Sequence, residues 1–209
     1  ARLSREGAAE AGKSESLIVG SIGPSGRVVM TEPGGEDVFY AAFREQAMGL
    51  ERGGADAAVV ETMSELAELV VAVRAVKENT RLPVFASMTY GSGPEKNRTS
   101  FGTDPAAHVR EARKAGADAV GANCGVGVND MVRVAEELKA EADCPIWIRP
   151  NAGIPQTVDG RVVYQEAPEP YAEKAAALVK TGVNFLGGCC GTTPEHIQKL
   201  AEMLSERNR

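Results

Sequence analysis

Residues 183–197 read VNFLGGCCGTTPEHI, and the rest of the sequence is interpreted from this segment outward. Its apolar start, Val183–Leu186, predicts a short strand. Thr193 is a suitable helix N-cap and Pro194 suits the first helical position, so a helix is expected to begin there. Two adjacent cysteines therefore lie between the carboxyl end of a strand and the start of a helix.

These cysteines, Cys189 and Cys190, can act together only if the chain leaves strand geometry at this point. Neighbouring side chains on a regular strand point to opposite faces. Gly187, Gly188 and Gly191 flank the pair, and glycine reaches backbone angles that other residues avoid. The segment therefore permits both sulfurs to face one site.

The composition is that of a globular domain, with 209 residues of which 43% are hydrophobic and 25% charged. A net charge of −6 without a basic stripe argues against a nucleic-acid partner. No apolar run approaches the about 20 residues of a membrane helix, and residues 1–16 lack the apolar core of a signal peptide. Four cysteines in a chain of this length indicate metal binding or reactivity, not a disulfide scaffold. We expect one cytoplasmic domain over residues 1–209, without a membrane partner.

Apolar segments alternate with amphipathic ones, which predicts strands that alternate with helices. The predicted strands are Leu17–Ile22, Ala57–Val60, Pro83–Thr89, Asp118–Ala122, Pro145–Ile148 and Val183–Leu186. The predicted helices are Arg2–Glu10, Glu36–Arg52, Ser64–Glu78, Pro105–Ala115, Asn129–Ala142, Pro170–Lys180 and Pro194–Glu206. A hairpin that turns at Asp159-Gly160 is predicted within Thr157–Tyr164.

An internal repeat supports this assignment. The segments ERGGADAAVVET, RKAGADAVGANC and VKTGVNFLGGCC share a helix end, a glycine and an apolar strand. Their matching glycines, Gly54, Gly116 and Gly182, are 62 and 66 positions apart, with one further strand and helix in each gap. Half of that spacing suits one βα unit, so a parallel sheet with helices outside is expected.

Six strands fall short of the eight that close a parallel barrel, which typically takes about 250 residues. We predict the α/β class and a (β/α)8 TIM barrel whose first two βα units are absent from this sequence. The alternative is an open doubly wound sheet. It is disfavoured because no strand-to-helix turn carries a GxGxxG fingerprint.

In such a barrel the active site lies at the carboxyl ends of the strands. Cys124 ends one predicted strand, 65 and 66 positions before Cys189 and Cys190, so only a curved or closed sheet brings the three together. Three thiolates predict zinc, which is four-coordinate and keeps one position open in catalytic sites. Three unrelated buried cysteines are the alternative, and Cys144, alone at a strand start, is expected to be structural. The other strand ends are Gly23, Glu61, Thr89 and Asn151.

Several segments resemble the homocysteine S-methyltransferase family. They are GANC at 121–124, RPNAGIP at 149–155 and GGCCGTTPEH at 187–196. VVETMSELAE at 59–68, FASMTY at 85–90 and RTSFGTDPA at 98–106 are most similar to the homocysteine-binding modules of cobalamin-dependent methionine synthases. The resemblance covers the whole chain, but the family's opening strand, with its D-G-x-M-G-T type loop, has no counterpart here.

The resemblance implies a (β/α)8 barrel in which Cys124, Cys189 and Cys190 hold zinc. It implies that Glu61 binds the substrate ammonium and that Asn151 lies near metal and substrate. From the residues alone, the alternative for Glu61 is a solvated strand end, and the alternative for Asn151 is a turn former before Gly153. Asn123 either caps a turn or contacts the substrate.

The expected reaction is methyl transfer to the thiolate of L-homocysteine, which gives methionine. A free thiol, with a pKa of about 8.5, is mostly protonated at neutral pH, and zinc binding removes the proton. The expected donor is a methyl-corrinoid on another domain or protein, and betaine and S-methylmethionine are the alternatives. No D-x-H-x-x-G corrinoid motif occurs here, so cobalamin would be carried by a partner domain or protein. A non-catalytic barrel that binds zinc and thiols is the alternative from another class.

Four further polar residues lie outside the expected site. His108 and His196 are predicted to be structural residues on helix surfaces. Lys96 and Arg98 are expected to be solvated in a loop at the mouth of the barrel, where contact with the donor is the alternative. The hairpin after Asn151 is either a lid or an addition without a role.

Overall fold

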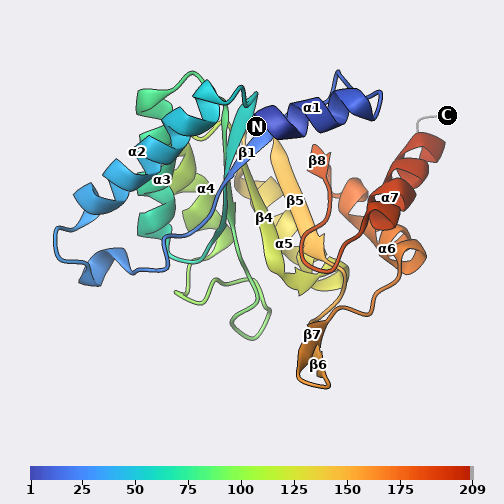
Figure 1. The fold of residues 1–209 in the computed structure, drawn as a ribbon. Coiled ribbons are helices and arrows are strands. Elements are labelled where there is room, and N and C mark those ends of the chain that lie inside the picture. Colours follow the sequence, from blue (N-terminus) through green and yellow to red (C-terminus); the bar gives the residue numbers. More distant parts are fainter. Residues whose placement is uncertain (208–209) are drawn as a thin grey trace.

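The computed structural model describes residues 1–207, in which six parallel strands form one sheet in the order β1-β2-β3-β4-β5-β8 (Figure 1). Each strand pairs in parallel with the next one along this order. The predicted strand order is therefore confirmed. The strands are β1 (Val19–Ile22), β2 (Ala57–Met63), β3 (Val84–Met88), β4 (Ala119–Gly127), β5 (Ile146–Asn151) and β8 (Phe185–Leu186).

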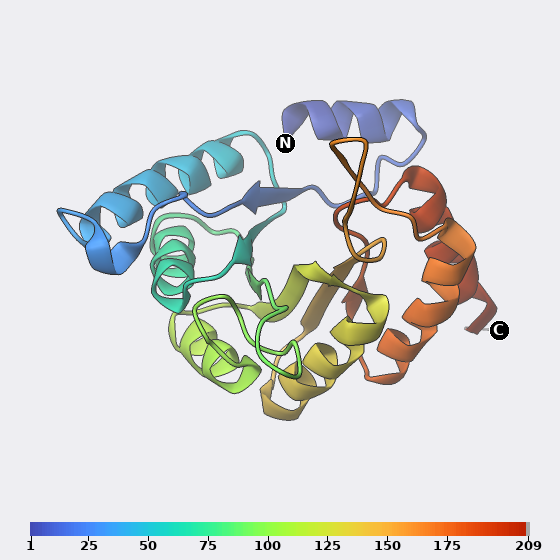
Figure 2. The same cartoon turned by 90° about the horizontal axis from the view of Figure 1, so that it is seen from below.

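Figure 2 shows that the sheet is strongly curved, with helices along its outer side. We call this arrangement a half-barrel, because the six parallel strands form part of the curved sheet that eight strands would close. The helices are α1 (Arg2–Glu10), α2 (Glu36–Arg52), α3 (Leu66–Asn79), α4 (Pro105–Lys114), α5 (Val128–Glu141), α6 (Pro168–Lys180) and α7 (Pro194–Arg207). A 3-10 turn, η1 (Val29–Thr31), precedes α2. None of the helices in the described part of the chain is long and apolar enough to cross a membrane.

The core lies between the outer face of the sheet and the helices. Helix α5 buries Met131, Ala135 and Leu138, whose spacing of four and three residues places them on one helical face. Alternate strand residues such as Val60 and Ile148 are fully buried in the same core. On the same two strands, Glu61 and Trp147 line the cavity on the other face of the sheet, so β2 and β5 contribute both to the core and to the lumen.

Three aromatic side chains pack together on the lumen side of the sheet. Phe85, Trp147 and Phe185 have ring centroids 5.3–5.6 Å apart. They come from β3, β5 and β8; Trp147 and Phe185 are paired neighbours on adjacent strands, and Phe85 reaches them from the far side of β4. The trio forms an apolar layer in the lumen.

Several strands extend further than predicted. β2 reaches Met63 and β4 reaches Gly127, because pairing resumes beyond a register shift in each strand. β5 reaches Asn151 by pairing with Gly127. β8 is shorter than predicted, because the Asn184 side chain accepts the Ile146 N–H that would begin the ladder.

The predicted hairpin is confirmed. Strands β6 (Gln156–Val158) and β7 (Arg161–Val163) pair antiparallel, and the turn residues Asp159 and Gly160 have φ of 50° and 74°. Both angles suit the two-residue turn that matches the twist of a hairpin. Figure 1 shows the hairpin projecting away from the sheet and helices.

Candidate metal centre

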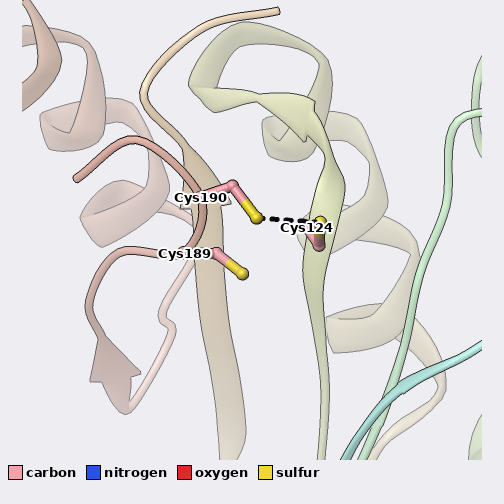
Figure 3. Close-up of side chains that lie close together, drawn as sticks. All are labelled: Cys124, Cys189 and Cys190. Atoms are coloured by element: carbon pink, nitrogen blue, oxygen red, sulfur yellow. Dashed lines mark hydrogen bonds between the residues drawn. The ribbon is translucent and has the colours of Figure 1, made fainter. Parts of the chain in front are cut away.

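Cys124, Cys189 and Cys190 converge at the carboxyl ends of the strands (Figure 3). Their sulfur atoms all lie within 4.8 Å of one another, and Cys124 Sγ is 3.7 Å from Cys190 Sγ. Cys124 belongs to β4, whereas the other two cysteines lie in the loop between β8 and α7. Cys144, predicted to be structural, is half-buried and is not part of this cluster.

The cluster fits a tetrahedral zinc ion. Zinc–sulfur bonds of about 2.3 Å at tetrahedral angles place sulfur atoms about 3.8 Å apart, close to the observed 3.7 Å. The three donors are soft sulfur atoms, a ligand type that zinc accepts readily once the thiols are deprotonated. A fourth position is left for an exogenous ligand such as a thiol.

The backbone at Cys124 is unusual because φ is 62° there. This residue lies within the register shift between β4 and β5, at residues 123–127, so the strand bulges and its side chains are re-aimed. The next residue must be glycine: a Cβ on Gly125 would lie 1.9 Å from the Tyr90 carbonyl oxygen. The bulge thus directs the Cys124 sulfur toward the other two.

The end of β5 fixes the loop that carries the other two cysteines. Asn151 Oδ1 accepts a hydrogen bond from the Cys190 backbone N–H at 3.1 Å, and the Cys189 N–H donates to the Pro150 carbonyl at 2.9 Å. The Ala152 N–H donates to the Cys190 carbonyl at 2.9 Å. Asn151 therefore lies beside the cluster, where its observed contact is to the backbone of a cysteine.

Asn123 is fully buried, and its amide is engaged on all sides. Its oxygen accepts hydrogen bonds from the Thr62 N–H at 2.9 Å and the Ser87 hydroxyl at 2.7 Å. Its nitrogen donates to Thr62 Oγ1 at 2.7 Å and to Cys189 Sγ at 3.7 Å. Asn123 thus orients a cysteine sulfur, and a contact with substrate stays a prediction.

The surroundings favour a thiolate at Cys189. Hydrogen bonding from the Cys124 thiol, supported by Asn123, the Cys190 N–H and the charge of Arg149, lowers the pKa of Cys189 to about 5. The same hydrogen bond and the burial of Cys124 raise the pKa of the Cys124 thiol. Cys189 therefore loses its proton more readily than Cys124 does.

A cavity of about 650 Å³ opens into the lumen next to the cluster. Glu61 lines it from β2 and is 14% exposed; it accepts hydrogen bonds from Ser21 Oγ at 2.6 Å and Arg149 Nη1 at 2.7 Å. The three cysteines are not among the lining residues, but Gly188, the residue before Cys189, is. Glu61 and the metal cluster therefore lie on neighbouring parts of one lumen.

Both histidines were predicted on the surface, and that is wrong. His108 and His196 are 0% and 4% exposed, because their rings point into the packing between elements. His108 bonds to the Tyr90 hydroxyl at 2.9 Å and to the Ala86 carbonyl at 3.2 Å, and His196 Nε2 contacts the Glu166 carbonyl at 2.9 Å. Their contacts fit the predicted structural roles.

The two loop cations each have an acidic partner. Lys96 Nζ lies 2.9 Å from Asp130, and Arg98 Nη1 lies 2.8 Å from Asp104. All four side chains are about a third to a half exposed. These pairs tie the loop to the neighbouring helices, and a contact with the donor stays a prediction.

Arg149 was not singled out from the sequence, although it begins one of the quoted motifs. The signal that could have found it is strand alternation, because Arg149 lies two residues after lumen-facing Trp147 on β5. A charged residue at an inward position near a strand end indicates a ligand contact in barrels of this type.

The curved parallel sheet and the three-cysteine cluster at its carboxyl edge define an α/β half-barrel with a candidate metal site. Residues 1–204 match the family model described as Homocysteine S-methyltransferase. The chain therefore belongs to the homocysteine S-methyltransferase family.

Two similar relatives are the methionine synthases of Mycobacterium leprae (strain TN) and Mycobacterium tuberculosis (strain ATCC 25618 / H37Rv). Each is 32% identical over 91% and 92% of this chain, respectively. The aligned region is 16% of either relative, so the chain spans about one sixth of their length.

Among solved structures, the homocysteine methyltransferase MmuM from Escherichia coli is similar in its apo and metallated forms. Both superimpose with a TM-score of 0.74 at 22% identity. The apo form matches 97% of this chain, which covers 68% of that chain. At this identity the likeness concerns the fold, and it supports a partial TIM-barrel architecture.

Proposed function

We propose that this chain binds zinc through Cys124, Cys189 and Cys190 and presents L-homocysteine for methylation at sulfur, giving methionine. The observation that carries the proposal is the convergence of three sulfurs within 4.8 Å at the carboxyl edge of the sheet. Family membership supports the substrate, since relatives are named methionine synthase and homocysteine methyltransferase. One of the similar solved structures is a metallated form, which supports a metal at this site.

The residues of the chain would prepare this site in defined ways. When bound, zinc supplies a Lewis acid at which a thiol loses its proton near neutral pH. Asn123 and Asn151 hold the cysteine pair through its sulfur and its backbone, and such supporting contacts orient metal ligands. Glu61, in the adjacent cavity, is proposed to bind the substrate ammonium.

The methyl donor is proposed to be a methyl-corrinoid on another domain or protein. The much greater length of the two methionine synthases supports this choice, because the matched region is only 16% of each and leaves room for a part that carries the donor. Betaine and S-methylmethionine are the competing donors. We treat residues 1–209 as one domain that contributes the homocysteine side of the reaction.

Zinc content tests the metal assignment directly. The wild-type chain is expected to hold one zinc per chain by elemental analysis, and Ala substitution of Cys124, Cys189 or Cys190 is expected to reduce occupancy. Cys144→Ala is the matched control and should retain full occupancy, because Cys144 lies outside the cluster. Full occupancy in any of the three cluster variants would contradict the assignment.

A donor screen on the zinc-loaded chain then tests the reaction. Methionine formation from L-homocysteine with methylcobalamin, and not with betaine or S-methylmethionine, is the expected result. A chain that binds zinc and L-homocysteine but turns over with none of these donors would favour the non-catalytic thiol-binding alternative.

A further inference from the structure

Arg149 occupies the lumen beside the metal cluster and is held by three contacts. Its Nε donates to the Gly188 carbonyl at 3.0 Å, and its Nη1 donates to Glu61 Oε2 at 2.7 Å. Its guanidinium carbon lies 5.7 Å from the centroid of the Trp147 ring. The side chain is 28% exposed and lines the cavity, so it is fixed in place yet open to a ligand.

The guanidinium retains unused donors. Arginine carries five N–H groups, and the two contacts above use one on Nε and one on Nη1. Within residues 1–207, Nη2 has no hydrogen-bond partner. A planar guanidinium matches a carboxylate with two parallel hydrogen bonds, which makes arginine the side chain best suited to that anion.

Arg149 and Glu61 place opposite charges side by side in one cavity. In the ligand-free protein each charge compensates the other, which avoids the cost of an unpaired charge in a partly dry lumen. An α-amino acid carries an ammonium and a carboxylate on the same carbon, so it presents the complementary pair of charges. Its thiol end would then extend toward Gly188 and the cysteines that follow.

We propose that Arg149 binds the α-carboxylate of the thiol substrate while Glu61 binds its ammonium, so that the pair selects α-amino-acid thiols over simple thiols. This inference rests on the proposed function and names a recognition residue for the same site. Arg149 is thereby a specificity-determining residue, and its contact to Gly188 also couples substrate recognition to the cysteine loop.

Three thiols that differ by one charged group test the proposal. L-Homocysteine has both charges, 4-sulfanylbutanoate lacks the ammonium, and 3-aminopropane-1-thiol lacks the carboxylate. Affinities are measured by isothermal titration into the zinc-loaded full chain. Arg149→Met should weaken L-homocysteine and 4-sulfanylbutanoate by about ten- to a hundredfold and leave 3-aminopropane-1-thiol within about threefold.

Glu61→Gln should give the opposite pattern, because it removes the partner of the ammonium and keeps the side-chain shape. L-Homocysteine and 3-aminopropane-1-thiol should weaken by about ten- to a hundredfold, and 4-sulfanylbutanoate should bind as well as before. Arg74→Met is the matched control, since Arg74 also pairs with a carboxylate, Glu78, and lies over an aromatic ring, Tyr40. It should change none of the three affinities.

Equal weakening of all three thiols by Arg149→Met would overturn the proposal, because it would assign Arg149 only to the support of the Gly188 loop. An unchanged affinity for 4-sulfanylbutanoate would overturn it as well. Arg149→Lys guards against misfolding: it keeps the charge but loses the fork, so its affinity for L-homocysteine should fall between those of wild type and Arg149→Met. A wild-type chain that holds zinc but binds no L-homocysteine would reject the proposed function itself, and with it this inference.

Discussion

At the scale of single residues, the candidate metal site includes one strained cysteine. A non-glycine residue in the left-handed region costs about 1–2 kcal/mol, because its Cβ crowds the following carbonyl oxygen. Cys124 adopts this conformation with φ of 62°, and Gly125 beside it leaves no space for a side chain. Such strain persists only where surrounding contacts enforce it, and it is common at functional sites.

The strain at Cys124 predicts an inverted order of stability for small substitutions. In the metal-free protein, Cys124→Gly should be more stable than Cys124→Ala by about 1 kcal/mol, since glycine adopts positive φ freely. Urea unfolding of the two variants measures the difference. Cys144 is the control because its φ is not positive, so Cys144→Gly should be no more stable than Cys144→Ala. If the Gly and Ala variants have the same order of stability at positions 124 and 144, Cys124 is not strained.

At the scale of elements, α4 and β3 are joined through a buried histidine. His108 of α4 contacts the Ala86 carbonyl of β3, and its other ring nitrogen meets the Tyr90 hydroxyl just after that strand. Burial lowers the pKa of His108 to about 4, although the hydrogen bond to Ala86 opposes this shift. The neutral imidazole is therefore the form that the folded protein accommodates.

This shift predicts a loss of stability at mildly acidic pH. Below a pKa of about 6.5 the unfolded chain binds a proton on His108 that the folded protein does not bind until about pH 4. Stability should thus decline from pH 6.5 toward pH 4, and this contribution should level off below that. His108→Gln should have a flatter profile in the same window, measured by urea unfolding at each pH. If the stability–pH profiles of wild type and His108→Gln run parallel, the pKa of His108 does not differ between the folded and unfolded states.

At the scale of the whole molecule, the sheet has two edges. Within the described residues, β1 pairs only with β2 and β8 pairs only with β5, so one side of each edge strand has no neighbour. The central strands β3 and β4 are paired on both sides and are covered by helices (Figure 2). The three-cysteine cluster links the centre of the sheet to one of its edges, because Cys124 lies on the central strand β4 and the cysteine pair follows the edge strand β8.

This asymmetry predicts unequal amide hydrogen exchange. Backbone amides of β8 and β1 should exchange at least about tenfold faster than those of β3 and β4, because edge segments open locally at lower free energy. Mass spectrometry of exchanged peptides measures the difference at one pH. Zinc addition should slow exchange in residues 187–191 more than in β1. Uniform protection across the sheet would contradict the half-barrel.

Some of this arrangement was predictable because it depends on local patterns. Alternation of apolar strands with amphipathic helices, together with the glycine repeat, was sufficient for six parallel strands in chain order. The bulge at Cys124 was not predicted, because it arises from pairing with β5, and neither was the burial of His108 and His196. Each of these features depends on contacts with another element, and the neighbouring residues in the sequence do not reveal those contacts.

The position of Cys124, Cys189 and Cys190 at the carboxyl ends of strands could be predicted from the amino-acid sequence, because strand periodicity and turn residues are short-range properties. The arrangement of charges in the lumen beside them depends on tertiary contacts. Glu61 and Arg149 are 88 positions apart. A solvated strand end was the alternative for Glu61, and Arg149 was not singled out. The curvature of the sheet turns both side chains inward, with Arg149 Nη1 2.7 Å from Glu61 Oε2. Reduced access of solvent in the lumen strengthens the electrostatic interactions of both charges, including those proposed with a ligand.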